Sequence, residues 1–395
     1  MPLNFEVELD QDALLNEALS NSPTIQKFEL QYKIKEEKVN EVNTLPNTEF
    51  GVGYFVSEPE TRTGTQRFKI SAKQMLPWFG TITARENYSS ALADADYVDI
   101  VITKRKLALS VSQLFYRLSA ITATKKVLDK SIQLLITYEK LALTSIEVGK
   151  ASVVDVLKLQ IRQNELQQQN EVLAEAYLGE QAAFNKLLNR NIKTEVNIIE
   201  TLLLPAEDII LVENVLGLNP ELLKYDKLYE SITQSELLNQ AERNPMIGFG
   251  LDYVPVSKRP DLSFNDNGKD IFMPMVSVSI PIFNKKYDSK SKQNQLKQLE
   301  ITAQKDNRLN VLESAFAKAI SQRNQARIKH NTEEKNLKKA HDAEVILIKN
   351  YETGTIVFSD LLDIQELQLK FQINLIQSTY EYYMQSAVVN YLITQ

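Results

Sequence analysis

Few side chains in this sequence of 395 residues are suited to catalysis or metal binding. There is no cysteine, which excludes disulfides, thiol nucleophiles and thiolate metal sites. The two histidines, His330 and His341, lie roughly 16 Å apart along a helix, too far to share a metal ion, and surface positions are the expected interpretation. Met273 and Met275 flank Pro274, where two thioethers could contact a soft metal, although ordinary strand or loop residues are the favoured interpretation.

Two carboxylates have a spacing with a chemical meaning. Asp360 and Asp363 share one face of a helix, where paired negative charge favours cations. The alternative is that both are ordinary exposed helix residues. No nucleophile motif, phosphate-binding glycine loop or metal-ligand cluster accompanies them, so we expect no enzyme activity, no cofactor and no metal site. The net charge of −6 gives no reason to expect nucleic-acid binding.

Long helices must position these residues. Glycine and proline, which cost roughly 1 and 3 kcal/mol inside a helix, are absent from 85–148, 150–178, 286–353 and 355–395. We expect the first long helix to turn at Gly149 and return as 151–190, and the second to turn near Gly354 and return as 355–394. Each return helix is shorter than its partner. Helices at 22–44 and 221–243 have about the missing length, so we expect them to stack end-on.

Four shorter segments alternate apolar with polar residues, which predicts β-strands: 46–56, 66–76, 245–255 and 274–283. Phe68 and Ile70 share one face of the second segment, and Lys69 and Ser71 share the other. Each segment has about the 9–11 residues that a tilted membrane strand needs. The polar linkers 57–65 and 256–272 are predicted to be hairpin loops.

The sequence is an internal duplication. Gly149 matches Gly354, Asp155 matches Asp360, and Gln160 matches Gln365, so each half reads helix, β-hairpin, long helix, glycine turn and return helix. We therefore expect two repeats, 1–206 and 207–395. The predicted parts are the β-hairpin 46–76 and helical hairpin 85–190 in the first repeat, and helix 221–243, β-hairpin 245–283 and helical hairpin 286–394 in the second.

Four strands cannot close a barrel, and an open sheet in lipid would leave backbone groups unpaired at its edges. Pooling strands between chains solves this problem, and three chains would supply twelve strands, enough for a pore. Small and polar residues on one face, such as Ser71, Gly250 and Ser277, suit a wet lumen, and the apolar face suits lipid.

The duplicated plan and the turns "VGKASVVDVLKLQ" and "TGTIVFSDLLDIQ" resemble the TolC family of outer-membrane efflux proteins over essentially the whole chain. The resemblance implies a mainly helical fold: a homotrimer with a twelve-stranded β-barrel in the outer membrane, four strands from each chain, and a long α-helical barrel across the periplasm. It implies partnership with a periplasmic adaptor and an inner-membrane pump of the RND or ABC type. It also implies export of drugs, metal ions, small toxic molecules or proteins, a choice that the sequence leaves open.

The resemblance also implies roles for individual residues. The family's acidic constriction matches Asp360 and Asp363, and its gate-closing positions match Asp155 and Tyr351. Some members have an arginine just after the second glycine turn, and it forms a salt bridge at the gate. This chain has Ile356 at that position, so the salt bridge is not expected here. The helix tips where adaptors dock match Val148, Gly149, Ala151, Gly354 and Ile356. Trp78, Phe79 and Tyr54 are expected at the membrane interfaces, with packed turn aromatics as the alternative.

Two alternatives accompany this interpretation. The first is an elongated periplasmic coiled-coil adaptor or scaffold without a pore, which would have no use for apolar residues along one face of four strands. The second concerns targeting: "MPLNFEVELDQD" has acidic residues and no apolar segment, so we expect no signal peptide in this chain, which would then be either a processed chain with a replacement Met1 or a protein that stays inside the cell. The expected location is nevertheless the outer membrane with a periplasmic extension.

Overall fold

The computed structural model describes residues 3–147, 152–198, 202–207, 215–261, 263–282, 284–353 and 355–393. The helices of these parts are α1 (Leu3–Asn21), α2 (Pro23–Val42), α3 (Thr81–Glu147), α4 (Val153–Leu187), the 3₁₀ helix η1 (Val215–Leu218), α5 (Pro220–Glu242), α6 (Lys286–Glu352) and α7 (Phe358–Ile393). Among the described helices, none combines the length and the apolar character that crossing a membrane requires.

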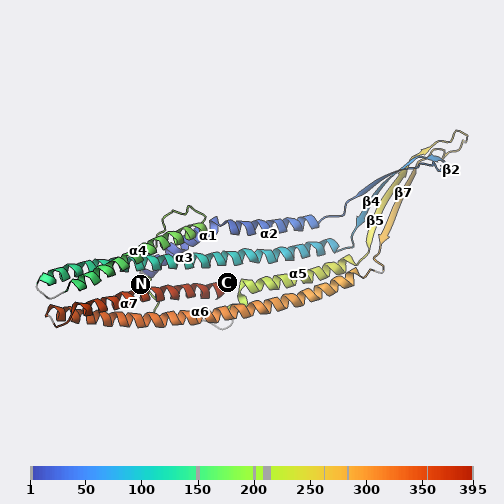
Figure 1. The fold of residues 1–395 in the computed structure, drawn as a ribbon. Coiled ribbons are helices and arrows are strands. Elements are labelled where there is room, and N and C mark those ends of the chain that lie inside the picture. Colours follow the sequence, from blue (N-terminus) through green and yellow to red (C-terminus); the bar gives the residue numbers. More distant parts are fainter. Residues whose placement is uncertain are drawn as a thin grey trace. The chain divides into compact units, whose positions relative to one another are not determined.

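The strands form two antiparallel sheets. One has the order β1 (Glu49–Tyr54), β4 (Phe68–Leu76), β5 (Met246–Val254), β7 (Ile271–Ser279), and the other has the order β2 (Glu60–Thr61), β3 (Gly64–Gln66), β6 (Val256–Ser257). Figure 1 shows β4, β5 and β7 running side by side in the larger sheet. The two sequence repeats therefore share each sheet.

The two longest helices, α3 and α6, each have 67 residues, and neither contains glycine or proline. The predicted ranges for them, 85–148 and 286–353, agree with the structure to within four residues. The earlier start of α3 follows Gly80, whose φ of +81° is a left-handed conformation that glycine adopts without strain. The absence of helix breakers therefore set these helices correctly.

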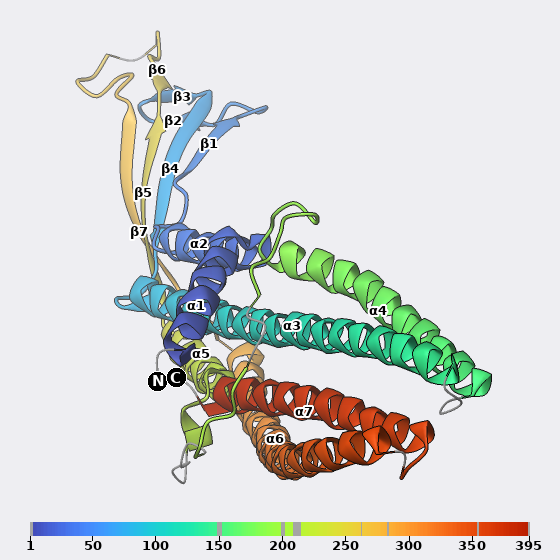
Figure 2. The ribbon, with the colours of Figure 1, turned by 90° about the vertical axis from the view of Figure 1, so that its left-hand side faces the viewer.

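The described residues divide into two compact units, each of which draws on both sequence repeats. The first comprises 1–27, 100–220 and 308–395, and contains two antiparallel helical hairpins: α3 with α4, and α6 with α7 (Figure 2). Its main core joins both hairpins through buried leucines, among them Leu135, Leu159, Leu361 and Leu369. Burying each such side chain contributes roughly 1.5–3 kcal/mol, so the hairpins are held together mainly by apolar packing.

Helix α1 of this unit is absent from the sequence prediction. Phe5, Val7 and Leu9 alternate with acidic residues, which is a strand-like period and hides a helix. Packing supplies the missing signal, because Ala18 is fully buried in a second core and Leu14 packs against it. Contacts with the rest of the unit, and not the local sequence pattern, therefore determine that this segment is a helix.

The second compact unit comprises 28–99 and 221–307. Its helices associate through polar side chains: Asn239 of α5 donates to the hydroxyl of Ser291 in α6 at 3.0 Å, and Ser235 donates to Asn294 at 3.3 Å. The end-on stacking of 22–44 and 221–243 stays a prediction, and one contact within the first unit involves the residue before α5. Asn219, just before α5, donates to the carbonyl of Leu392 in the last turn of α7 at 2.9 Å.

The strand predictions were right in number for the large sheet and wrong in detail elsewhere. Strand β7 begins at Ile271, three residues before the predicted 274, although it contains Pro274. Within the described chain β7 is an edge strand, the kind of strand in which a proline is best tolerated. The linkers 57–65 and 256–272 were predicted to be loops. They hold the short strands β2, β3 and β6, in which β3 of the first linker pairs with β2 and also with β6 of the second linker. The division into repeats at 206/207 remains a prediction.

Candidate functional site

The end of the first helical hairpin is built around Asp155. The backbone N–H of Asp155 donates to the Ser152 hydroxyl at 3.3 Å, and the backbone N–H of Ser152 donates to the Asp155 carboxylate at 3.0 Å. This reciprocal pair is a capping box, which satisfies two N–H groups at the start of α4. Asp155 therefore has a structural task at this position.

Asp360 occupies the equivalent first turn of α7, with a different environment. Its N–H donates to the carbonyl of Val357 at 3.2 Å, and the residue is exposed. Asp363, one turn later, is also exposed, and it borders a cavity of about 330 Å³ among α3, α4 and α7. Leu135 and Leu166 contribute to the apolar lining of that cavity. Both predicted carboxylates are therefore exposed to solvent.

Tyr351 lies in an aromatic cluster at the same end of the hairpins. Its hydroxyl donates to the Ser145 hydroxyl at 3.4 Å, and its ring meets that of Phe358 edge-on, with 5.5 Å between centroids. The ring of Phe358 also meets Tyr138, with 6.2 Å between centroids. Asp155 forms its hydrogen bonds with Ser152. The two residues predicted to close the gate, Asp155 and Tyr351, therefore contact different partners. The cluster joins α3 of the first hairpin to α6 and α7 of the second.

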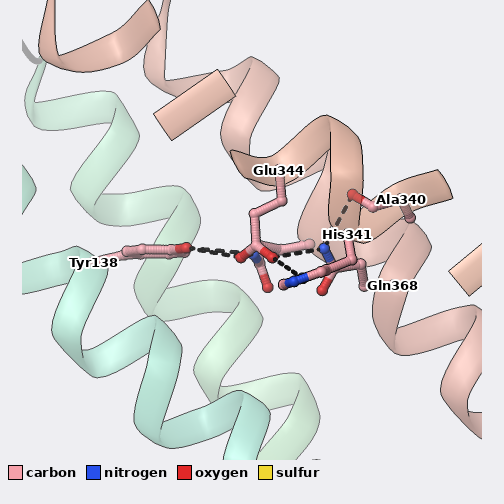
Figure 3. Close-up of polar contacts among 6 residues, drawn as sticks. Tyr138, Ala340, His341, Glu344 and Gln368 are labelled. Atoms are coloured by element: carbon pink, nitrogen blue, oxygen red, sulfur yellow. Dashed lines mark hydrogen bonds and ion pairs between the residues drawn. The ribbon is translucent and has the colours of Figure 1, made fainter. Parts of the chain in front are cut away.

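Glu344 of α6 is the centre of a polar node that links both hairpins (Figure 3). Its carboxylate accepts a hydrogen bond from Gln368 at 2.8 Å, one from Gln365, and one from the Tyr138 hydroxyl at 3.5 Å. The Glu344 side chain is 14% exposed, and His341 on the same helix approaches it at 3.3 Å. Because the acceptor is charged and largely buried, these bonds are strong and costly to lose.

The same arrangement occurs in the first hairpin. Glu139 of α3 accepts from Gln160 at 2.7 Å and from Gln163 at 2.9 Å. Glu344, Gln365 and Gln368 each lie 205 positions after these residues, so the motif belongs to the duplication. The Gln160 and Gln163 amides lower the pKa of Glu139. Each hairpin is therefore fixed in register by one carboxylate on the long helix and two glutamines on the return helix.

Tyr138 has no counterpart, because position 343 is alanine. Burial, with Glu344 as the second cause, raises the pKa of Tyr138 to about 12. Its folded pKa lies above the ordinary value of 10.0, so the stability linked to it is present below about pH 10 and is lost as the pH rises toward 12.

We expect this tyrosine to be visible in titration. The difference in absorbance at 295 nm between the native protein and a Tyr138→Phe variant should report one phenol that ionises near pH 12. A difference curve centred near pH 10 would mean that the phenol is neither buried nor close to the Glu344 carboxylate. Tyr54→Phe, which removes an exposed tyrosine, serves as the matched control variant.

An ion pair joins the two return helices. Arg162 of α4 approaches Glu366 of α7 at 3.5 Å and Glu165 of its own helix at 2.8 Å. Ile356, which follows the second glycine turn, is half-buried. Arg162 of the first hairpin therefore supplies an ionic link between the two hairpins, which sequence reasoning missed.

The large sheet has one apolar and one polar face. The register places the apolar side chains together across all four strands, as Val52, Ile70, Tyr253 and Phe272 illustrate by pairing in one row. Exposed members of this face are Phe50, Val52, Tyr54, Phe68, Ile70, Phe249, Leu251, Tyr253, Phe272, Val276 and Val278. In the described chain, no helix or strand covers them. The polar face includes a buried Asp252 that pairs with Lys69.

Aromatic residues mark both ends of this apolar face. Tyr54 is 71% exposed and pairs in register with Phe68 at one end of β4. Trp78 and Phe79 follow the other end of β4, and their rings meet edge-on with 5.9 Å between centroids. The nine residues of β4 between these groups span roughly 30 Å. Such spacing is typical of aromatic belts at two membrane interfaces.

Solved structures of outer-membrane channels share this architecture. The outer-membrane protein VceC of Vibrio cholerae is 14% identical, with 97% of this chain and 95% of that one covered and a TM-score of 0.76. CusC is 13% identical, with 97% and 92% covered and a TM-score of 0.79. The MtrE channel of Neisseria gonorrhoeae, in its open state, is 14% identical, with 97% and 88% covered and a TM-score of 0.73.

The chain has the fold of these outer-membrane channels. Comparison of the sequence with family models and with curated proteins gives no match. The architecture predicted from the TolC resemblance, mainly helical with four strands per chain, is confirmed. The duplication and turn motifs thus identified the fold at a sequence identity where it is hard to detect.

Some residues predicted to have a role in this outer-membrane channel fold have no structural description. Val148, Gly149, Ala151 and Gly354, predicted to dock an adaptor, lie outside the described residues. Glu344, Tyr138 and Arg162 were missed, although the matched Gln160 and Gln365 could have led to the first of them. Within the described ranges, no group of three or more histidine, cysteine, aspartate or glutamate side chains could hold a metal ion.

One histidine does not lie where it was expected. His330, predicted at the surface, is half-buried and lines a cavity of about 580 Å³ with α3, α7 and residues 202–206. His341 is exposed, as expected. The helix face that carries His330 is covered because α6 packs against α7 over this stretch, as the bond from Lys329 to Glu381 at 3.1 Å illustrates.

Proposed function

We propose that this protein is a TolC-family channel subunit that forms a homotrimeric exit duct in a bacterial outer membrane. It would receive cargo from a periplasmic adaptor and an inner-membrane pump and conduct it to the exterior. The observation that carries the proposal is the uncovered apolar face of the four-stranded sheet, with an aromatic pair beyond one end and aromatic residues at the other. Monomeric soluble proteins rarely expose so large a contiguous apolar area.

The edges of the sheet support the trimer. Within the described residues, β1 and β7 each pair with a strand on one side only. Lipid offers no hydrogen bonds to the free side of either strand. Pairing β7 of one chain with β1 of the next satisfies both edges, and a closed ring of three chains has twelve strands. The apolar residues then face lipid, and Ser71, Ser277 and Ser279 face the lumen.

The helical hairpins are proposed to form the periplasmic tunnel and its gate. Asp360 and Asp363 are exposed at the start of α7, so three chains would place six carboxylates around the axis. Asp155 and Tyr351 support the gate, the first by capping α4 and the second through the aromatic cluster. The tips around Gly149 and Gly354, including Ile356, are proposed to contact the adaptor.

We expect the purified protein to form discrete, cation-preferring conductance steps in planar lipid bilayers. The Asp360→Asn, Asp363→Asn double variant should lose about tenfold in cation over anion permeability, equivalent to about 1.4 kcal/mol, because the variant removes the charge that attracts cations. Reversal potentials under a salt gradient measure this change. A charge-matched control, Asp306→Asn with Glu313→Gln, removes two exposed charges from α6. Equal reversal potentials for both variants would reject the gate assignment.

A scaffold or adaptor without a pore is the other candidate. It would be a monomer that stays in solution without detergent, and it would give no conductance. Recovery of a trimer in carbonate-washed outer-membrane fractions supports the duct, whereas a detergent-free monomer would reject it.

A further inference from the structure

The methionines of this chain are concentrated on one face of one sheet. The sequence has six, at positions 1, 75, 246, 273, 275 and 384. Strand alternation and register place four of them on the polar face of the large sheet: Met75 of β4, Met246 of β5, and Met273 and Met275 of β7. This is the face that carries Ser277 and Ser279, opposite the apolar one. Thioethers on a wet face have little to gain from burial, which makes their grouping notable.

Two glycines make room for these side chains. An added Cβ at Gly248 would lie 2.5 Å from the Met75 sulfur, and one at Gly250 would lie 3.3 Å from the Met275 methyl group. Met75 and Met275 therefore lean over β5 from opposite sides. Because Gly248 and Gly250 are two positions apart on the same face, the two side-chain ends lie roughly 7 Å apart. A long, flexible methionine side chain can close that separation by rotation alone.

The surroundings suit a soft monovalent ion. Neutral thioether sulfur is a ligand for Cu(I) and other soft cations, and a poor one for Mg²⁺, Ca²⁺ or Zn²⁺. The charged groups of this face balance, with Glu49 and Asp252 against Lys69 and Lys73, so no excess of positive charge repels a cation. The Ser277 hydroxyl lies 4.0 Å from the Met75 sulfur and adds a polar neighbour. Met275 is 37% exposed, which leaves the site accessible.

We propose that Met75 and Met275 form a thioether site for Cu(I) or Ag(I) over Gly248 and Gly250, flanked one register step beyond on either side by Met246 and Met273. In the proposed duct this face lines the lumen, so the site would offer a soft cation a resting point on its way out. The site itself depends on one chain and its sheet, and does not require the channel to conduct.

The test is a calorimetric titration of the full-length protein in detergent with silver nitrate, in chloride-free buffer. We expect the native protein to bind Ag(I), and the Met75→Leu, Met275→Leu variant to bind it at least about tenfold more weakly, since leucine keeps the volume and removes the sulfur. Met384→Leu, which removes a sulfur from α7, is the matched control and should bind as the native protein does. Zn²⁺ should not compete.

X-ray absorption at the silver edge supplies the second measurement. Sulfur scatterers around Ag(I) in the native protein, depleted in the double variant, support the proposal. Native-like binding by the double variant, equal losses in the Met384→Leu control, or oxygen and nitrogen scatterers alone would overturn it. The silver titration requires no conduction, and the bilayer recording of the proposed duct requires no silver, so the two experiments can fail independently.

Discussion

A Val276→Arg variant is expected to lose most of its trimer from the outer membrane. Val276 is 71% exposed on the apolar face at the middle of β7. If that face contacts lipid, an arginine there costs about 2–4 kcal/mol in each chain, and three chains carry the penalty together. We expect a heat-resistant trimer band to disappear from outer-membrane fractions, and the chain to be found as degraded or aggregated monomer. Immunoblotting of fractionated membranes measures both species.

The neighbouring residue provides the control. Ser277 lies between Val276 and Val278 of the apolar face, but its own side chain belongs to the opposite face. A Ser277→Arg variant introduces the same charge and bulk one position away, and in the proposed duct it would point into water. It should assemble at near-native levels. Equal assembly of the two variants, or a loss in Ser277→Arg alone, would contradict the assignment of the apolar face to lipid.

Removing the Glu344 carboxylate is expected to have the second-largest effect. A Glu344→Ala variant leaves the Gln365 and Gln368 amides and the Tyr138 hydroxyl without their acceptor. Gln368 is 9% exposed and Tyr138 is 6% exposed, so water cannot fully replace it. Stranding buried donors costs about 1–3 kcal/mol, which should raise hydrogen exchange of the amides in 340–352 and 358–369 by about tenfold to a hundredfold.

Glu139 is the matched control within the same chain, because it makes the same pair of contacts from the equivalent position. It is more open to water: Gln160 is exposed, and no tyrosine contacts Glu139 among the hydrogen bonds of the described residues. We expect Glu139→Ala to cost under about 1 kcal/mol and to change exchange near α4 by a few fold at most. Faster exchange in Glu139→Ala than in Glu344→Ala would show that burial does not govern the strength of these nodes.

The hydrogen bonds from Gln160 and Gln163 to Glu139 should also make the stability of the first hairpin depend on pH. The glutamine amides lower the pKa of Glu139, so its contribution to stability is present above the ordinary carboxyl pKa of 4.5 and is lost as the pH falls through the lower folded value. Because one proton per chain is involved, the change confined to α3 and α4 should be small and should vanish in Glu139→Gln.

The helices were predictable because their signals are local. A long run without glycine or proline, with apolar residues recurring every three or four positions, favours a helix on local grounds, which is why the bounds of α3 and α6 were nearly correct. Alternation likewise gave the four long strands. The two-residue strands β2 and β6 were missed because their pairing depends on loops that meet only in the folded chain, and no period can appear in so short a segment.

The polar contacts of the candidate site were less predictable for the same reason. Glu344 is one of many glutamates on α6, and its sequence neighbours do not distinguish it from exposed ones. It differs in what packs against it: Tyr138 comes from another hairpin, 206 positions away. The ion pair from Arg162 to Glu366 also joins distant segments. Comparing the two halves of the duplication position by position would have shown the repeated glutamate and glutamines, but not the tyrosine.

The lone tyrosine of this node divides the seams of a three-chain ring into two kinds. Six hairpins would surround the axis, two from each chain. At every second interface between neighbouring hairpins, the one within a chain, the Tyr138 hydroxyl would donate to the Glu344 carboxylate. The seams between chains would have Ala343 at that place, which has nothing to donate to Glu139. Widening such a ring would separate the interfaces between chains first, because they lack this hydrogen bond. The end of the tunnel would then open as three rigid pairs of hairpins and not as six independent hairpins.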